Sequence, residues 1–191
     1  KSRKGFIANN YAMSISGRAS STIDKLVIAP LLGFALLGNY SLALQLFVIL
    51  LIVPTIIYKY LLPLDSSGVL NKKLRQTTIT LSVGIAVLGI VLFPYVIPNF
   101  FPKFIDAIDA IQIMSIAIIP ATITLLYTSK LLGLEKSKFV LTAQIISAST
   151  LIAGFIILGP VFGIMGLASV FVLSVTLEAV LLLCITKIKK F

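Results

Sequence analysis

The sequence predicts an all-α membrane protein, a polytopic helical bundle with six transmembrane helices within residues 1–191. Hydrophobic residues make up 59% of the chain and charged residues only 12%, and the mean hydropathy is +1.12. A soluble domain has about 25% charged residues. Six apolar stretches reach the roughly 20 residues that a helix needs to cross a bilayer. Continuous apolar runs such as residues 46–54 lack the alternation expected of barrel strands.

Helix-breaking or charged residues separate the predicted spans. Gly33 and Gly38 are expected to flank a tight turn, and a polar loop follows at residues 62–75. Three prolines in residues 94–104 are expected to exclude one continuous helix there. Residues 133–138 and 158–166 are the last two expected turns. The predicted spans are 6–32, 38–62, 76–98, 105–129, 138–159 and 164–186.

Three prolines lie inside or at the ends of these spans: Pro54, Pro63 and Pro120. Proline frees a backbone carbonyl and bends a helix, which a membrane protein tolerates when neighbouring groups satisfy that carbonyl. Each bend is interpreted either as a packing kink or as a hinge for alternating access.

Basic residues alternate between the two sides of the predicted bundle. The N-terminus, the second and fourth connections and the C-terminal tail hold 13 Lys and Arg residues, whereas the other connections hold only Lys103. Short loops rich in Lys and Arg stay in the cytoplasm, so both termini are predicted to be cytoplasmic. The net charge of +10 is then mostly orientation charge that faces anionic membrane lipids, and no nucleic-acid partner is expected.

The first predicted span contains three charged residues, Arg18, Asp24 and Lys25. Charge near the centre of a bilayer costs several kcal/mol, so such residues usually face a bundle interior or a wet cavity. On a helix, five polar residues fall within an arc of about 80° and form a stripe that predicts a cavity wall. The stripe consists of Asn10, Ser14, Arg18, Ser21 and Lys25.

Two cations and one anion give this wall a net positive charge, which favours an anionic substrate such as a phosphate or pyrophosphate. Two structural alternatives stay open. The charges could form a buried ion-pair group that locks helices together, and Lys25 could extend to the outer interface.

Glu178 in the last span is a second candidate, with Ser174 one turn earlier. Its carboxylate could partner Arg18 or bind a coupling cation or proton, or it could lie among the cytoplasmic head groups. Asp106 and Asp109 are interpreted as acids that favour the start of the fourth span, with a cation site as the alternative. The remaining candidates are interhelical amides (Gln45, Gln112, Gln144) and interface anchors or cavity walls (Tyr11, Tyr40, Tyr95, Tyr127). Cys184, at the cytoplasmic end, is interpreted as a small apolar residue.

The composition also argues against catalysis. The chain has no His and one Cys, which excludes His/Cys zinc sites, catalytic groups that need His, and an internal disulfide. It has no phosphate-binding GxxxxGK[ST] loop and only six acids. We expect no enzyme activity, cofactor or bound metal.

Several segments together resemble one transporter family. They are DKLVIAPLLGFALLGNYSLALQL (24–46), LLPLDSSG (61–68) followed by KKLRQ, PYVIPNFFPKFIDAIDAIQIMSI (94–116), KLLGLEKSKF (130–139) and GPVFGIMGLASV (159–170). With them the chain resembles the polysaccharide and O-antigen flippases of the multidrug/oligosaccharidyl-lipid/polysaccharide exporter superfamily.

The resemblance implies a function and a missing partner. Members have two six-helix lobes around a central cavity, and this chain is similar to the second lobe. It begins at Lys1 and not at Met, so we expect a fragment of a longer transporter or a processed chain, with an N-terminal six-helix lobe as its partner. The implied activity is export of a polyprenyl-pyrophosphate-linked oligosaccharide across the cytoplasmic membrane by alternating access, and Arg18, Asp24 and Lys25 occupy the place of the family's charged seventh helix.

Two alternatives remain open. One is a cation-coupled multidrug exporter of the same superfamily, although a basic cavity favours an anionic substrate. The other is a non-transporting membrane scaffold of a polysaccharide assembly complex.

Overall fold

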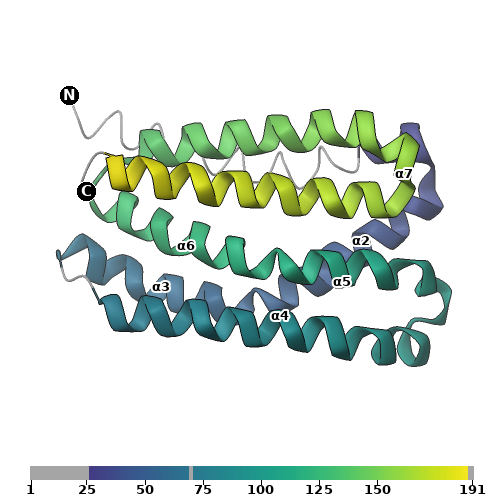
Figure 1. Cartoon of the computed structure of the whole chain (residues 1–191), viewed down its shortest axis with the longest axis horizontal. Helices are drawn as coiled ribbons and strands as arrows, with labels where there is room; N and C mark the ends of the chain where they lie inside the picture. The colour runs from purple at the N-terminus through teal and green to yellow at the C-terminus, as the bar shows by residue number, and fades with distance from the viewer. Residues whose placement is uncertain (1–25, 69–70, 189–191) are drawn as a thin grey trace.

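The computed structural model describes residues 26–68 and 71–188, and every regular element in these ranges is a helix. Helical residues 26–32 are followed by α2 (Phe34–Leu50), α3 (Ile52–Ser66), α4 (Lys72–Phe100), the 3-10 helix η1 (Pro102–Ala107), α5 (Ile108–Ile116), α6 (Ile118–Gly133) and α7 (Ser137–Ile188). The long helices run side by side along the long axis of the molecule (Figure 1). The predicted all-α fold is confirmed for the described residues.

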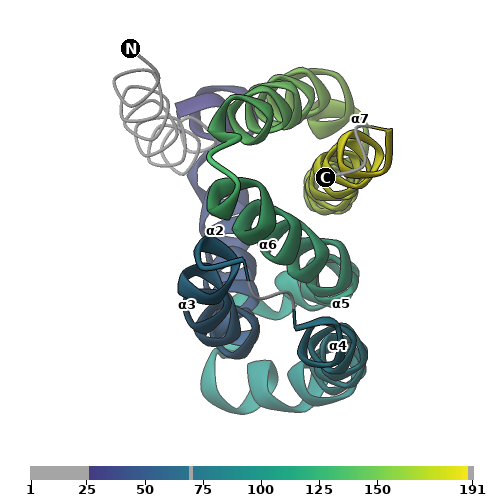
Figure 2. The ribbon, with the colours of Figure 1, turned by 90° about the vertical axis from the view of Figure 1, so that its left-hand side faces the viewer.

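The helix α7 folds back on itself at Gly163. This glycine has φ 57° and ψ −134°, a conformation that residues with a side chain rarely adopt. The two arms, residues 137–162 and 164–188, lie side by side and antiparallel (Figures 1 and 2). Gly154 packs against Val170, and the Ser147 hydroxyl donates to the Ser174 carbonyl at 2.9 Å. The predicted turn at 158–166 is therefore confined to one residue.

Two bends divide the helices that precede α4 and α7. The axes of α2 and α3 differ by 49°, and those of the η1–α5 segment and α6 by 41°. The breaks lie at Leu51 and Ala117, each three residues before a proline, Pro54 or Pro120. A proline ring clashes with the carbonyl four residues earlier, which explains both positions.

One expected break was wrong and another was confirmed. Gly33, with φ 86°, separates two helical segments, but Gly38 lies inside α2. The expected break within residues 94–104 is confirmed at Phe101, where α4 ends before η1 begins. The helix α4 nevertheless continues through Pro94 and Pro98 to Phe100. Pro94 cannot bond the Ile90 carbonyl, and the Gln112 amide of α5 donates to that carbonyl at 3.1 Å. A neighbouring helix thus satisfies the freed carbonyl, so α4 is not interrupted.

In the part of the chain that the structure describes, two helices, α4 and α7, are long and apolar enough to cross a membrane, and up to four candidate spans result if each bent pair counts as one. The described residues are therefore consistent with a multi-pass membrane protein. Many large apolar side chains point outward, including Val87, Tyr95 and Ile157. The core is centred on α5, where Ala110, Ile111 and Met114 are fully buried between α2, α4 and α7.

The helix order places the basic residues at one end of the bundle. The α3–α4 and α6–α7 connections and the end of α7 lie together, opposite η1 and the fold of α7 (Figure 1). Lys103 belongs to η1 at the other end. The described basic residues in or near the first end are Lys59, Lys72, Lys73, Arg75, Lys130, Lys136, Lys138 and Lys187.

Close contact between α3 and α6 depends on Gly133. A Cβ atom there would lie 2.7 Å from the Asp65 carbonyl carbon, whereas a Cβ on Gly84 of α4 would meet no atom within 4 Å. We expect Gly133→Ala to lower the free energy of unfolding by about 1–3 kcal/mol, because the two helices must separate. Gly84→Ala should be neutral or stabilise by up to about 1 kcal/mol. Unfolding of the detergent-solubilised variants measures both, and equal losses would contradict the contact.

Candidate basic site between α3, α4 and α6

A buried ion pair joins three helices at the basic end. Asp65, in the last turn of α3, has a side chain that is 1% exposed. It accepts hydrogen bonds from Arg75 Nη2 at 2.5 Å and from the Ser129 hydroxyl of α6. Arg75 Nη1 donates to the Leu126 carbonyl at 2.6 Å. The guanidinium is thereby fixed between a carboxylate and a backbone carbonyl.

Local sequence explains how these groups meet. Asn71 caps α4 by accepting from the Leu74 amide at 3.0 Å, which starts the helix just before Arg75. Ser129 and Gly133 are four residues apart and therefore share one face of α6. That face contacts the end of α3, where Gly133 leaves room for the Asp65 backbone.

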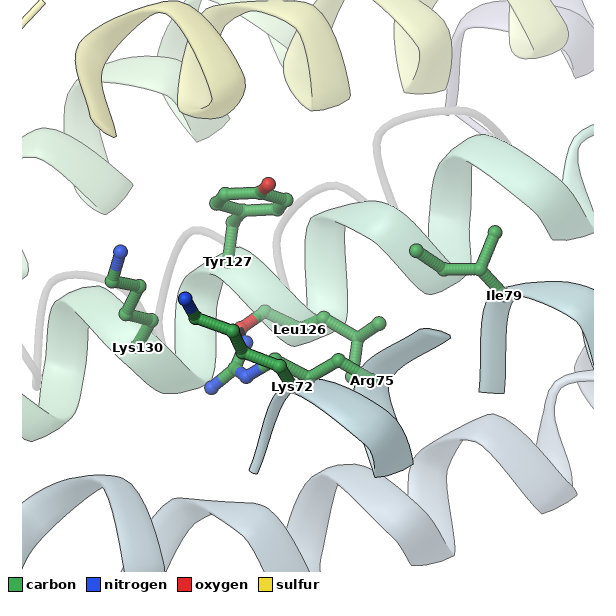
Figure 3. Close-up of a pocket in the computed structure, with 6 residues that line it drawn as sticks. All are labelled: Lys72, Arg75, Ile79, Leu126, Tyr127 and Lys130. Carbon is green, nitrogen blue, oxygen red and sulfur yellow. Dashed lines mark hydrogen bonds between the residues drawn. The ribbon is translucent and has the colours of Figure 1, made fainter. Parts of the chain in front are cut away.

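Beside the ion pair lies a pocket of about 210 Å³ with a basic lining. Three cationic side chains contribute to it, Lys72 and Arg75 from the first turn of α4 and Lys130 from the end of α6 (Figure 3). Lys72 and Arg75 are three residues apart, as are Tyr127 and Lys130, so each pair shares a helix face. The other lining residues are Ile79, Leu126 and Tyr127.

The charge arrangement at this end of α4 is unfavourable without a partner. The first turn of α4 has no acidic residue and carries Lys72, Lys73 and Arg75. A helix N-terminus is partially positive, so cations there are destabilising. Asp65 offsets one charge, but its Oδ1 atom and Arg75 Nε have no hydrogen-bond partner. Departures from local sequence rules are typical of functional sites.

The residues of the predicted substrate wall lie outside the described residues. They are Asn10, Ser14, Arg18, Ser21, Asp24 and Lys25, together with Tyr11. Their placement on a cavity stays a prediction.

Glu178 lies on the second arm of α7 and is half-buried. Its carboxylate lies near the Ser147 side chain of the first arm, and Ser147 bonds the backbone one turn earlier, at Ser174. Glu178 is therefore part of a polar contact between the two arms. Its coupling role and its pairing with Arg18 stay predictions.

The other polar candidates have varied environments. Gln112 forms the predicted interhelical hydrogen bond, whereas Gln45 is exposed and Gln144 Oε1 is buried without a partner. Asp109 lies in the first turn of α5, as the helix-dipole interpretation predicts, and Asp106 is exposed in η1. Among the tyrosines, Tyr127 lines the basic pocket, Tyr40 is buried against the Phe155 ring and Tyr95 is exposed. Cys184 is an exposed free thiol on the second arm of α7.

Within residues 26–68 and 71–188 there is no group of three or more His, Cys, Asp or Glu side chains that could hold a metal ion. From the sequence alone, Lys72, Arg75 and Lys130 indicate only membrane orientation, and Asp65 has no predicted role. The signal for the pocket was present in the repeated three-residue spacing of Lys72 with Arg75 and of Tyr127 with Lys130.

Comparison with known proteins finds no family model, no curated protein and no solved structure that matches this chain. The resemblance to flippases therefore stays a prediction from the sequence.

Proposed function

We propose that this chain is the second lobe of an exporter that moves a lipid-linked oligosaccharide across the cytoplasmic membrane by alternating access. The observation that carries the proposal is the polar stripe with Arg18 and Lys25 on one face of the first predicted span. Two cations in an apolar segment suit a phosphate-bearing substrate, because the membrane interior excludes charge that has no partner. The resemblance to the flippase family supports the same substrate, a polyprenyl-pyrophosphate oligosaccharide.

The proposed topology has six spans with both termini in the cytoplasm. Each arm of α7 forms one span, α4 forms another, each bent pair forms one, and residues 6–32 form the first. The gathering of basic residues at one end of the bundle supports this orientation. An N-terminal six-helix lobe completes the cavity.

The orientation predicts a labelling pattern. In a Cys184→Ser background, we expect Asn99→Cys to react with a membrane-impermeant maleimide added outside the cell. Lys73→Cys should react only after the membrane is permeabilised, because it lies at the opposite end of α4. Residues 1–191 contain no other cysteine, so this part of the protein offers no competing thiol. The reverse labelling pattern would contradict the orientation.

Glu178 is the proposed coupling residue. It is the acidic side chain that the described residues place between the two arms of α7, next to Ser147. A carboxylate in this position can bind a proton or a cation as the helices rearrange.

A transport assay tests the proposal. The complete transporter is reconstituted in vesicles that contain a fluorescent polyprenyl-pyrophosphate disaccharide, and loss of accessibility to an external quencher is followed. We expect movement of this lipid and none of the matched neutral polyprenyl disaccharide. Transport of cationic dyes in its place would indicate a multidrug exporter. Transport of neither class would indicate a scaffold.

A further inference from the structure

We propose that the pocket between α4 and α6 is a binding site for a phosphate or diphosphate group at the basic end of the bundle. The described residues that line it all belong to α4 and α6, and none of them belongs to the predicted stripe. The site does not require that the chain transports its ligand.

Charge is the first reason. Lys72, Arg75 and Lys130 line one cavity, and among the described residues no acidic side chain lines it. Asp65 forms a salt bridge with Arg75 at 2.5 Å but does not line the cavity. Mutual repulsion among the cations and the positive helix end of α4 both disfavour the empty pocket. A bound anion offsets both effects.

Arg75 gives the pocket a fixed wall. Its two terminal nitrogens are bonded to Asp65 and to the Leu126 carbonyl, so the guanidinium keeps its position when a ligand approaches, and the two lysines carry the charge that an anion would meet. The lysines supply point charges from both helices, which is the usual complement to an arginine in phosphate sites. Figure 3 shows Lys130 and the Tyr127 ring on one side of α6, with Lys72 and Arg75 across from them on α4.

Size restricts the ligand. The pocket has a volume of about 210 Å³. Pockets for drug-sized molecules begin at about 300 Å³. The site therefore takes a small anionic head group, while a lipid chain or sugar attached to it would remain outside.

The test uses inorganic pyrophosphate and the detergent-solubilised chain in titration calorimetry. Lys72→Gln and Lys130→Gln should each weaken binding about tenfold, because each removes a charge-assisted contact. The matched control is Lys73→Gln, which removes the same charge from the same exposed turn of α4 but does not line the pocket. It should change the affinity less than twofold. Thermal unfolding of each variant establishes that it is folded.

A second arm distinguishes a free anion from a lipid head group. Neutral phosphatidylcholine nanodiscs that contain the chain are prepared with either polyprenyl phosphate or polyprenol, and competition with pyrophosphate is measured. Competition by the phosphate lipid identifies a lipid head group as ligand, and its absence identifies the free anion; both support the site. Equal weakening by Lys72→Gln and Lys73→Gln, or no binding of either probe, would overturn it. Because no step is transport, failure here leaves the exporter proposal standing, and the reverse also holds.

Discussion

Asp65→Leu is expected to lower the free energy of unfolding by about 3–5 kcal/mol. The substitution leaves Arg75, whose side chain is only 14% exposed, without its carboxylate, and it removes the acceptor of the Ser129 hydroxyl. Three helices would lose their common polar contact. The measurement is reversible unfolding of the purified protein in mixed detergent micelles.

A second substitution, at Arg75, tests whether the unpaired charge causes the loss of stability. Combining Asp65→Leu with Arg75→Met removes both charges, and the double variant should recover most of the loss, since an apolar pair of similar volume is often as stable as a buried ion pair. Asp106→Asn, an exposed acid at the other end of the bundle, should change stability by less than about 0.5 kcal/mol. If the double variant is no more stable than Asp65→Leu, the ion pair is not the source of the effect.

Arg18→Ala should remove most export in the assembled transporter. If Arg18 contacts the phosphate of the substrate in a water-poor cavity, the loss is about 1.5–3 kcal/mol, or roughly 10- to 150-fold in substrate affinity. Arg18→Lys should retain partial export, because the charge remains while the planar fork is lost. The vesicle assay with the pyrophosphate disaccharide measures both variants.

A matched control separates substrate binding from membrane insertion. Arg3→Ala removes the same charge from the segment that precedes the first predicted span, and it should leave export unchanged. Both proteins must reach the membrane in equal amount. Wild-type export by an inserted Arg18→Ala protein would reduce the stripe to a structural ion-pair group.

Local chemistry predicted the helices well and some of their ends poorly. The turn at residues 133–138 is confirmed, with α6 ending at Gly133 and α7 starting at Ser137. Glu135 there adopts φ 57°, and the Lys136 amide bonds the Leu131 carbonyl at 2.7 Å, which closes the helix end. The continuity of α4 through Pro94 was not predictable, because its cause is a side chain 22 residues from the freed carbonyl.

The same distinction applies to the site. Asp65 reads as part of a polar loop in the sequence, and its role depends on Ser129, which is 64 residues away along the chain. Counting the basic residues in each connection predicts membrane orientation. Such a count does not predict a shared pocket, because it does not consider which helix faces meet. Pairing the spacing of Lys72 and Arg75 with that of Tyr127 and Lys130 requires knowing that α4 and α6 are neighbours.

The contact between α3 and α6 limits how this bundle can change shape. Each of these helices begins at a proline-associated bend, α3 at Leu51 and α6 at Ala117. A swing of α3 alone would pull Asp65 away from Ser129 and from the close-packed Gly133. We therefore expect α3 and α6 to move together as one rigid unit. Any conformational change that moves one of them then has to alter both bend angles, at Leu51 and at Ala117.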